Sequence, residues 1–138
     1  MHLHANIVAI FLIVDDDRDI VEMLRQLLIL EGHTVLTAYS GQDGIDALRT
    51  CRPDAILLDV EMPILSGPDM AYRMFEHNCG DELLPILILS GASDVNLIAK
   101  RVGTPYFLCK PYKIDALLSM LDRILTEHIA PLHKKRLA

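Results

Sequence analysis

Four apolar runs, each stopped by a polar residue, constrain the fold of this chain more than any other feature. The clearest run is residues 55–58, which ends at Asp59. Four consecutive apolar residues indicate a strand buried on both faces, because a half-exposed strand alternates apolar and polar residues. The other three runs lead into residues 15–17, Ser90 and Lys110. Each of these predicted strands therefore ends in a carboxylate, a hydroxyl or an amine.

Helical signals separate the predicted strands. The expected strands are residues 7–14, 33–38, 55–59, 86–90 and 106–109. Three of the expected helices begin after a capping residue, which is Asp16 or Asp17, Ser40 or Ser93. A fourth is expected to begin at Gly67 and Pro68. The fifth is indicated by an apolar stripe at helical spacing, made of Ile114, Leu117, Leu118, Leu121, Ile124 and Leu125. Strands that alternate with helices predict an α/β fold, with a doubly wound five-stranded parallel sheet covered on both faces. In such a sheet the C-terminal ends of the strands line one edge, where ligands bind.

The acids expected at this edge predict a cation site. Adjacent carboxylates repel each other unless a proton or a cation lies between them. Asp15 and Asp16 alone favour a plain helix cap, but Asp59 is expected to reach the same edge and reverses that preference. Mg²⁺ fits three such acids, because it commonly takes one or two carboxylates and keeps waters that substrate oxygens replace.

Lys110 and Ser90 add groups that phosphoryl chemistry requires. A carboxylate that attacks phosphorus forms an acyl phosphate, whose oxygens need a metal, an ammonium and hydroxyl or amide donors. A lone lysine or serine at a strand end is ordinary surface. The prediction therefore depends on the coincidence of four strand ends, with Asp59 as the nucleophile.

These ordered motifs resemble those of response-regulator receiver domains in two-component signalling. The matching residues are Ile13-Val14-Asp15-Asp16-Asp17, Leu57-Leu58-Asp59-Val60-Glu61-Met62-Pro63 with Gly67, Leu89-Ser90-Gly91 and Leu108-Cys109-Lys110-Pro111. The resemblance covers about residues 7–125. It implies a flavodoxin-like (βα)5 fold with strand order 2-1-3-4-5, a receiver domain at residues 6–127, and a C-terminal tail or the start of a linker at residues 128–138.

The resemblance also implies a role for each residue. Asp59 would accept the phosphoryl group from the phosphohistidine of a sensor histidine kinase or a histidine phosphotransfer protein. The expected Mg²⁺ ligands are the side chains of Asp15, Asp16 and Asp59 and the backbone carbonyl of Glu61, with Asp15 acting largely through a water. Lys110 would pair with Asp59 before the reaction and with the phosphoryl group after it, and the Lys110–Pro111 bond is expected to be cis. Such a protein is no enzyme beyond its own phosphorylation and dephosphorylation.

Similar domains switch when the hydroxyl at the end of the fourth strand moves inward and an aromatic residue on the last strand reorients. Ser90 and Phe107 stand at these two positions, and Ser90 would bond a phosphoryl oxygen. Phe107 lacks the hydroxyl of the tyrosine that the family often has there, so plain core packing is its alternative role. Tyr106 is expected on the opposite face of the strand. A downstream protein would read the switch, while dimerisation on phosphorylation stays open.

Composition limits the partners and the cellular compartment that are expected for this chain. The formal net charge of −6 disfavours direct binding to nucleic acid. The apolar run near the N-terminus is too short to span a membrane, so no membrane partner is expected. An odd number of cysteines without metal-ligand spacing indicates reduced thiols in a cytoplasmic protein, and each is expected as a small core residue. These cysteines are Cys51, Cys79 and Cys109.

Three other classes of protein share part of this pattern. An aspartyl-nucleophile hydrolase of haloacid-dehalogenase type is the main alternative, but such enzymes usually carry Asp-x-Asp, and here the second acid is Glu61. A flavodoxin-like FMN carrier needs a first loop that accepts phosphate, which the acids at residues 15–17 would repel. A degenerate receiver that only binds partners lacks some of the polar groups, whereas here every expected one is present.

Overall fold

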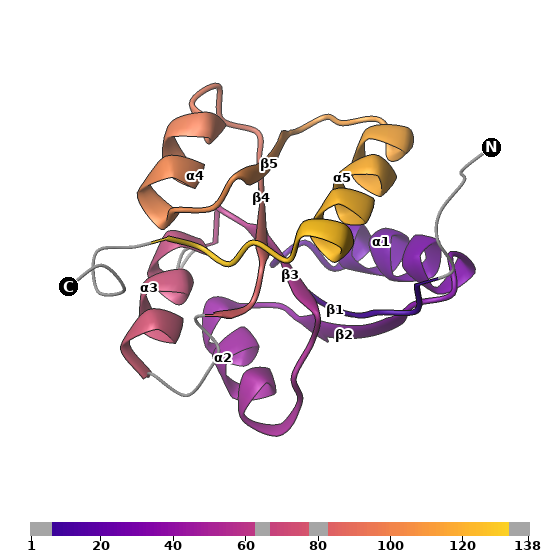
Figure 1. The fold of residues 1–138 in the computed structure, drawn as a ribbon, viewed down its shortest axis with the longest axis horizontal. Coiled ribbons are helices and arrows are strands. Elements are labelled where there is room, and N and C mark those ends of the chain that lie inside the picture. The colour runs from indigo at the N-terminus through magenta and orange to yellow at the C-terminus, as the bar shows by residue number, and fades with distance from the viewer. Residues whose placement is uncertain (1–6, 63–66, 78–82, 133–138) are drawn as a thin grey trace.

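The computed structural model describes residues 7–62, 67–77 and 83–132, in which strands and helices alternate along the chain (Figure 1). The strands are β1 (Ile10–Val14), β2 (Thr34–Ala38), β3 (Ala55–Asp59), β4 (Ile86–Ser90) and β5 (Tyr106–Cys109). The helices are α1 (Arg18–Leu30), α2 (Gly41–Thr50), α3 (Gly67–His77), α4 (Val95–Val102) and α5 (Ile114–Glu127). The predicted α/β class is confirmed.

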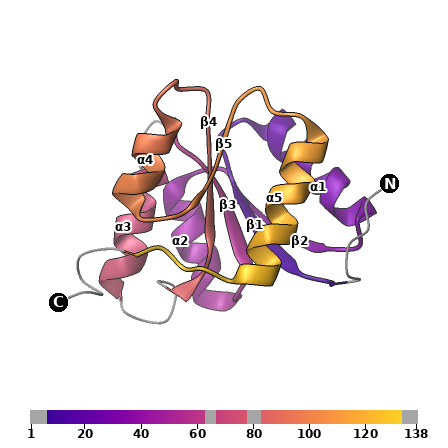
Figure 2. The ribbon, with the colours of Figure 1, turned by 45° about the horizontal axis from the view of Figure 1, so that its top comes forward.

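The strands form one parallel sheet in the order β2-β1-β3-β4-β5. Helices α1 and α5 cover one face of this sheet, and α2, α3 and α4 cover the other (Figures 1 and 2). β3 lies at the centre, and all of its residues are buried, as a run of consecutive apolar residues predicts for a strand covered on both faces. The doubly wound sheet and its predicted strand order are therefore confirmed.

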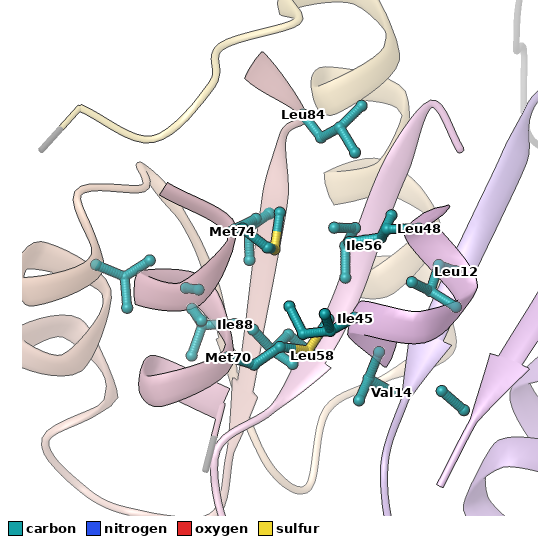
Figure 3. Close-up of a cluster of buried hydrophobic side chains, with 14 of the residues drawn as sticks. Leu12, Val14, Ile45, Leu48, Ile56, Leu58, Met70, Met74, Leu84 and Ile88 are labelled. Carbon is teal, nitrogen blue, oxygen red and sulfur yellow. The ribbon is translucent and has the colours of Figure 1, made fainter. Parts of the chain in front are cut away.

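Alternation along each strand divides the core into two clusters. Ile56 and Leu58 of β3 pack toward α2, α3 and α4, whereas Ala55 and Leu57 pack toward α1 and α5. Figure 3 shows part of the first cluster, in which strand side chains meet side chains from α2 and α3. The labelled residues are Leu12, Val14, Ile45, Leu48, Ile56, Leu58, Met70, Met74, Leu84 and Ile88. Apolar packing thus stabilises the sheet on both of its faces.

Side-chain caps mark the starts of α1 and α2. The Asp17 carboxylate accepts hydrogen bonds from the backbone N–H groups of Asp19 and Ile20, at 3.0 and 3.3 Å, and so caps α1. Ser40 accepts one from the backbone N–H of Asp43 at 3.0 Å and caps α2 as predicted. The predicted cap at Ser93 is wrong. α4 begins one residue later than expected, with Asp94 at the cap position and no side-chain cap hydrogen bond.

Several sequence predictions differ from the structure in detail. β1 begins at Ile10 rather than at residue 7. Ile114 is 53 % exposed, because periodicity identifies the apolar face of α5 but not the point at which the sheet ceases to cover it. Cys51 and Cys109 are free and exposed rather than core residues. Pro63, Cys79 and the chain from residue 133 onward lie outside the described residues.

The segment after α5 returns toward α4 (Figure 1). His128 ends the helix in a left-handed conformation, and the backbone N–H of Leu132 donates to the carbonyl of Gly103 at 2.8 Å. The first part of the predicted tail therefore packs on the loop between α4 and β5. Within the described ranges, no helix combines the length and apolar character that crossing a membrane requires.

Candidate functional site

The polar residues predicted at the strand ends lie together at one edge of the sheet. Asp15 directly follows β1, Asp59 is the last residue of β3, Ser90 is the last residue of β4, and Lys110 directly follows β5. Because these strands are parallel and adjacent, their C-terminal ends share one edge. The topology thus gathers residues that are far apart along the chain.

Three carboxylates form a cluster at this edge. One oxygen from each of Asp15, Asp16 and Asp59 lies within 4.8 Å of the other two. Asp15 and Asp59 are buried, at 2 % and 3 % exposure, whereas Asp16 is exposed. A hydrogen bond of 2.9 Å from the backbone N–H of Asp17 to Asp15 Oδ1 orients the Asp15 carboxylate. Hard oxygen donors at this spacing fit a divalent cation such as Mg²⁺.

Lys110 brings the positive charge. Its Nζ donates to Asp59 Oδ1 at 2.9 Å and to Asp15 Oδ2 at 3.4 Å. Its backbone N–H donates to the Ser90 carbonyl at 2.7 Å, which ties the end of β5 to the end of β4. The bond between Lys110 and Pro111 is cis, as expected. The lysine is thereby held against both buried carboxylates.

Two buried carboxylates share one ammonium in this site. Burial raises the pKa of Asp59 to about 6, although the hydrogen bond from Lys110 acts to lower it. Burial also raises the pKa of Asp15, against the N–H of Asp17 and the charge of Lys110. For Lys110, burial acts to lower the pKa, but the two carboxylates outweigh it and the pKa is raised. One ammonium faces two buried carboxylates and the exposed Asp16, so the site has room for more positive charge.

The Ser90 hydroxyl makes a contact that the sequence did not indicate. Ser90 Oγ donates to Glu61 Oε1 at 2.6 Å and accepts from the backbone N–H of Ala92 at 3.0 Å. Ser90 is fully buried, whereas Glu61 is exposed. No sequence signal marks this pair, because the contact arises only when β3 and β4 lie side by side.

Phe107 belongs to the edge strand β5. It is 36 % exposed, so plain core packing, the alternative role, is wrong for this residue. The reason is that β5 has a neighbour on one side only. Tyr106 is buried on the opposite face, as the pleat predicts. A switching role for Phe107 stays a prediction.

Comparison with known proteins agrees with this arrangement. The family model of the response regulator receiver domain matches residues 11–122. Response regulator MprA of Mycolicibacterium vanbaalenii is 35 % identical over 116 residues, which is 83 % of this chain and 49 % of MprA. The chain thus spans about half the length of the curated relatives that it matches.

Solved structures show the same fold. The chemotaxis protein CheY4 of Vibrio cholerae has a TM-score of 0.77 at 30 % identity, covering 86 % of this chain and 100 % of CheY4. TrrA of Thermotoga maritima, a response regulator solved in complex with Mg(2+)-BeF, has a TM-score of 0.73 at 25 % identity, covering 84 % of this chain and 98 % of TrrA. The haloacid-dehalogenase alternative is not favoured. With the fold, the strand-end residues and the family match in agreement, the chain belongs to the response regulator receiver domain family of two-component signalling.

Proposed function

We propose that this domain takes a phosphoryl group from a phosphohistidine onto Asp59 in a Mg²⁺-dependent reaction, and that the phosphorylated form changes its binding to a downstream protein. The observation that carries the proposal is the ion pair of 2.9 Å between Lys110 and Asp59, inside the acidic cluster. Outside its own phosphorylation and dephosphorylation, the domain catalyses nothing.

The reaction uses Asp59 as the nucleophile. A carboxylate oxygen of Asp59 attacks the phosphorus, the bond from phosphorus to the donor histidine nitrogen breaks, and an acyl phosphate remains. Lys110 favours the ionised form of Asp59 that the attack needs, and its ammonium then neutralises charge on the phosphoryl oxygens. Ser90 would donate its hydroxyl proton in a hydrogen bond to another phosphoryl oxygen.

The donor set supports a Mg²⁺ site. The proposed ligands are the side chains of Asp15, Asp16 and Asp59 and the backbone carbonyl of Glu61. A cation bound there would neutralise charge on the phosphoryl oxygens. The buried carboxylates of Asp15 and Asp59 outnumber the single ammonium of Lys110, which supports this assignment on charge alone.

The partners follow from the receiver family. The proposed donor is a sensor histidine kinase or a histidine phosphotransfer protein, and the proposed receiver unit spans residues 6–127. We propose that residues 128–138 form a C-terminal tail or the start of a linker. The free, exposed Cys51 and Cys109 support a reducing compartment, the cytoplasm.

Labelling with a small phosphodonor tests the proposal. Incubation with acetyl phosphate and Mg²⁺ should add the mass of one phosphoryl group, sensitive to hydroxylamine, in intact mass spectrometry. The label should disappear in Asp59→Asn and when a chelator removes Mg²⁺. The control Asp46→Asn changes an exposed acid on α2 and should label like the natural protein. Equal labelling of Asp59→Asn would overturn the assignment of the phosphoacceptor.

A further inference from the structure

The Ser90 hydroxyl already has a hydrogen-bond acceptor, the carboxylate of Glu61. A serine hydroxyl has one proton to donate, and Ser90 donates it to Glu61 Oε1 at 2.6 Å. The same oxygen accepts from the backbone N–H of Ala92. Ser90 is fully buried, so its hydroxyl has no contact with bulk water. The hydroxyl therefore cannot donate to a phosphoryl oxygen on Asp59 until it leaves Glu61.

The hydrogen bond between Ser90 and Glu61 is charge-assisted. An O–H group that donates to an ionised carboxylate forms a shorter and stronger hydrogen bond than a neutral pair does. Glu61 belongs to the short segment after β3, and Ser90 ends β4, so the bond connects the ends of two neighbouring strands. Through the N–H of Ala92, it also connects Glu61 to the loop that leads into α4.

We propose that Glu61 is a positioning residue that holds the Ser90 hydroxyl in the unphosphorylated state and competes with the phosphoryl group for its hydrogen bond. This inference depends on the proposed phosphorylation of Asp59. When Ser90 turns to the phosphoryl group, the exposed carboxylate of Glu61 is solvated by water, so its release is reversible. The strength of this bond then sets how far the equilibrium of the loop before α4 favours the inactive arrangement.

Glu61 also acts on the site through its charge, and a test must separate the two effects. Its carboxylate is near enough to Asp59 to raise the pKa of that residue. Any variant that removes the charge will therefore favour binding of an anion at Asp59, whether or not the contact with Ser90 matters. A dependence on the Ser90 hydroxyl, by contrast, arises only if the two side chains interact.

Binding of beryllium fluoride with Mg²⁺, a stable mimic of the phosphoryl group on a carboxylate, measures the competition. Isothermal titration should show Glu61→Ala binding this mimic roughly three- to tenfold more tightly than the natural protein, the range expected when a charge-assisted hydrogen bond to an exposed acid is lost. Glu61→Gln loses the charge but keeps an oxygen that can accept from Ser90, so its gain should be smaller. Because Glu61 is exposed, both variants should fold.

The decisive comparison repeats the Glu61→Ala change in two other backgrounds. In Ser90→Ala the gain should shrink to less than about twofold, whereas Ser90→Thr, which retains a hydroxyl, should keep it. An equal gain in the natural protein and in both of these backgrounds would overturn the inference and leave a plain charge effect. Failure of the natural protein to bind the mimic, or equal binding by Asp59→Asn, would instead overturn the proposed function.

Discussion

At the scale of single residues, the main feature of the site is that its carboxylates outnumber its one ammonium group. Asp15 and Asp59 are both buried, and both contact the same ammonium of Lys110. A lysine can neutralise one of them, so the second carboxylate is stable only with a proton or with a cation. The same excess of negative charge makes the site sensitive to pH and supports the proposed Mg²⁺ site.

This excess of negative charge predicts how the stability of the metal-free protein depends on pH. The pKa of Asp59 is about 6 in the folded protein and 3.8 ordinarily, so between these values the folded state holds a proton that the unfolded state has released. The stabilisation from this proton is complete below the lower value and is lost as the pH rises through the higher one. The contribution of Asp59 to the free energy of unfolding should therefore fall, by at most about 3 kcal/mol, over this window.

Urea denaturation in a chelator, measured at several pH values, checks this prediction. Asp59→Asn should remove the share of the pH dependence that belongs to Asp59 and should be more stable than the natural protein at neutral pH. The control Asp46→Asn, on the exposed face of α2, should keep the natural dependence. If Asp59→Asn and the natural protein showed the same dependence between pH 4 and 6, the raised pKa of Asp59 would be contradicted.

At the scale of elements, the ends of helices determine which chain segments can approach one another. α1 is followed by Gly32 with φ of +93°, and α4 by Gly103 with φ of +92°. Both glycines adopt the left-handed conformation that side chains disfavour. Their surroundings differ, because Gly32 faces open space, whereas the backbone of Leu132 lies directly against Gly103.

This difference gives a matched pair of variants. Gly32→Ala should lower the free energy of unfolding by about 1 kcal/mol, the usual cost of a left-handed alanine. Gly103→Ala should cost clearly more, because the added methyl group would overlap the carbonyl of Leu132 and displace the segment after α5. Thermal or urea denaturation of the two variants provides the comparison. Equal losses would show that this segment does not pack on Gly103 in solution.

At the scale of the whole molecule, one sheet carries two separate apolar clusters. Ile56 and Leu57 are adjacent in β3, yet Ile56 belongs to the cluster under α2, α3 and α4, and Leu57 to the one under α1 and α5. Both residues are fully buried. Because β3 is shared by the two clusters, loss of packing on one face should lower the free energy of unfolding of the entire domain.

We therefore expect Ile56→Ala and Leu57→Ala each to cost about 2–5 kcal/mol. Both should unfold in urea in a single transition with an unchanged m-value, because the clusters form one cooperative unit. Leu97→Ala, at a position on α4 that is 53 % exposed, should change stability by less than about 0.5 kcal/mol. Two separate transitions in either core variant would show that the faces unfold independently.

The sequence by itself determined the architecture and the main members of the site. Its consecutive apolar runs, separated by helical signals, predict strands buried on both faces of a parallel sheet, and the C-terminal ends of such strands present Asp59, Ser90 and Lys110 at one edge. The resemblance to receiver domains already implied that Lys110 pairs with Asp59, but only the tertiary structure decided that Lys110 also contacts Asp15 and that Ser90 donates to Glu61. The physical reason is that periodicity and capping act between residues near in the chain, whereas these contacts form only after separate strands have packed side by side.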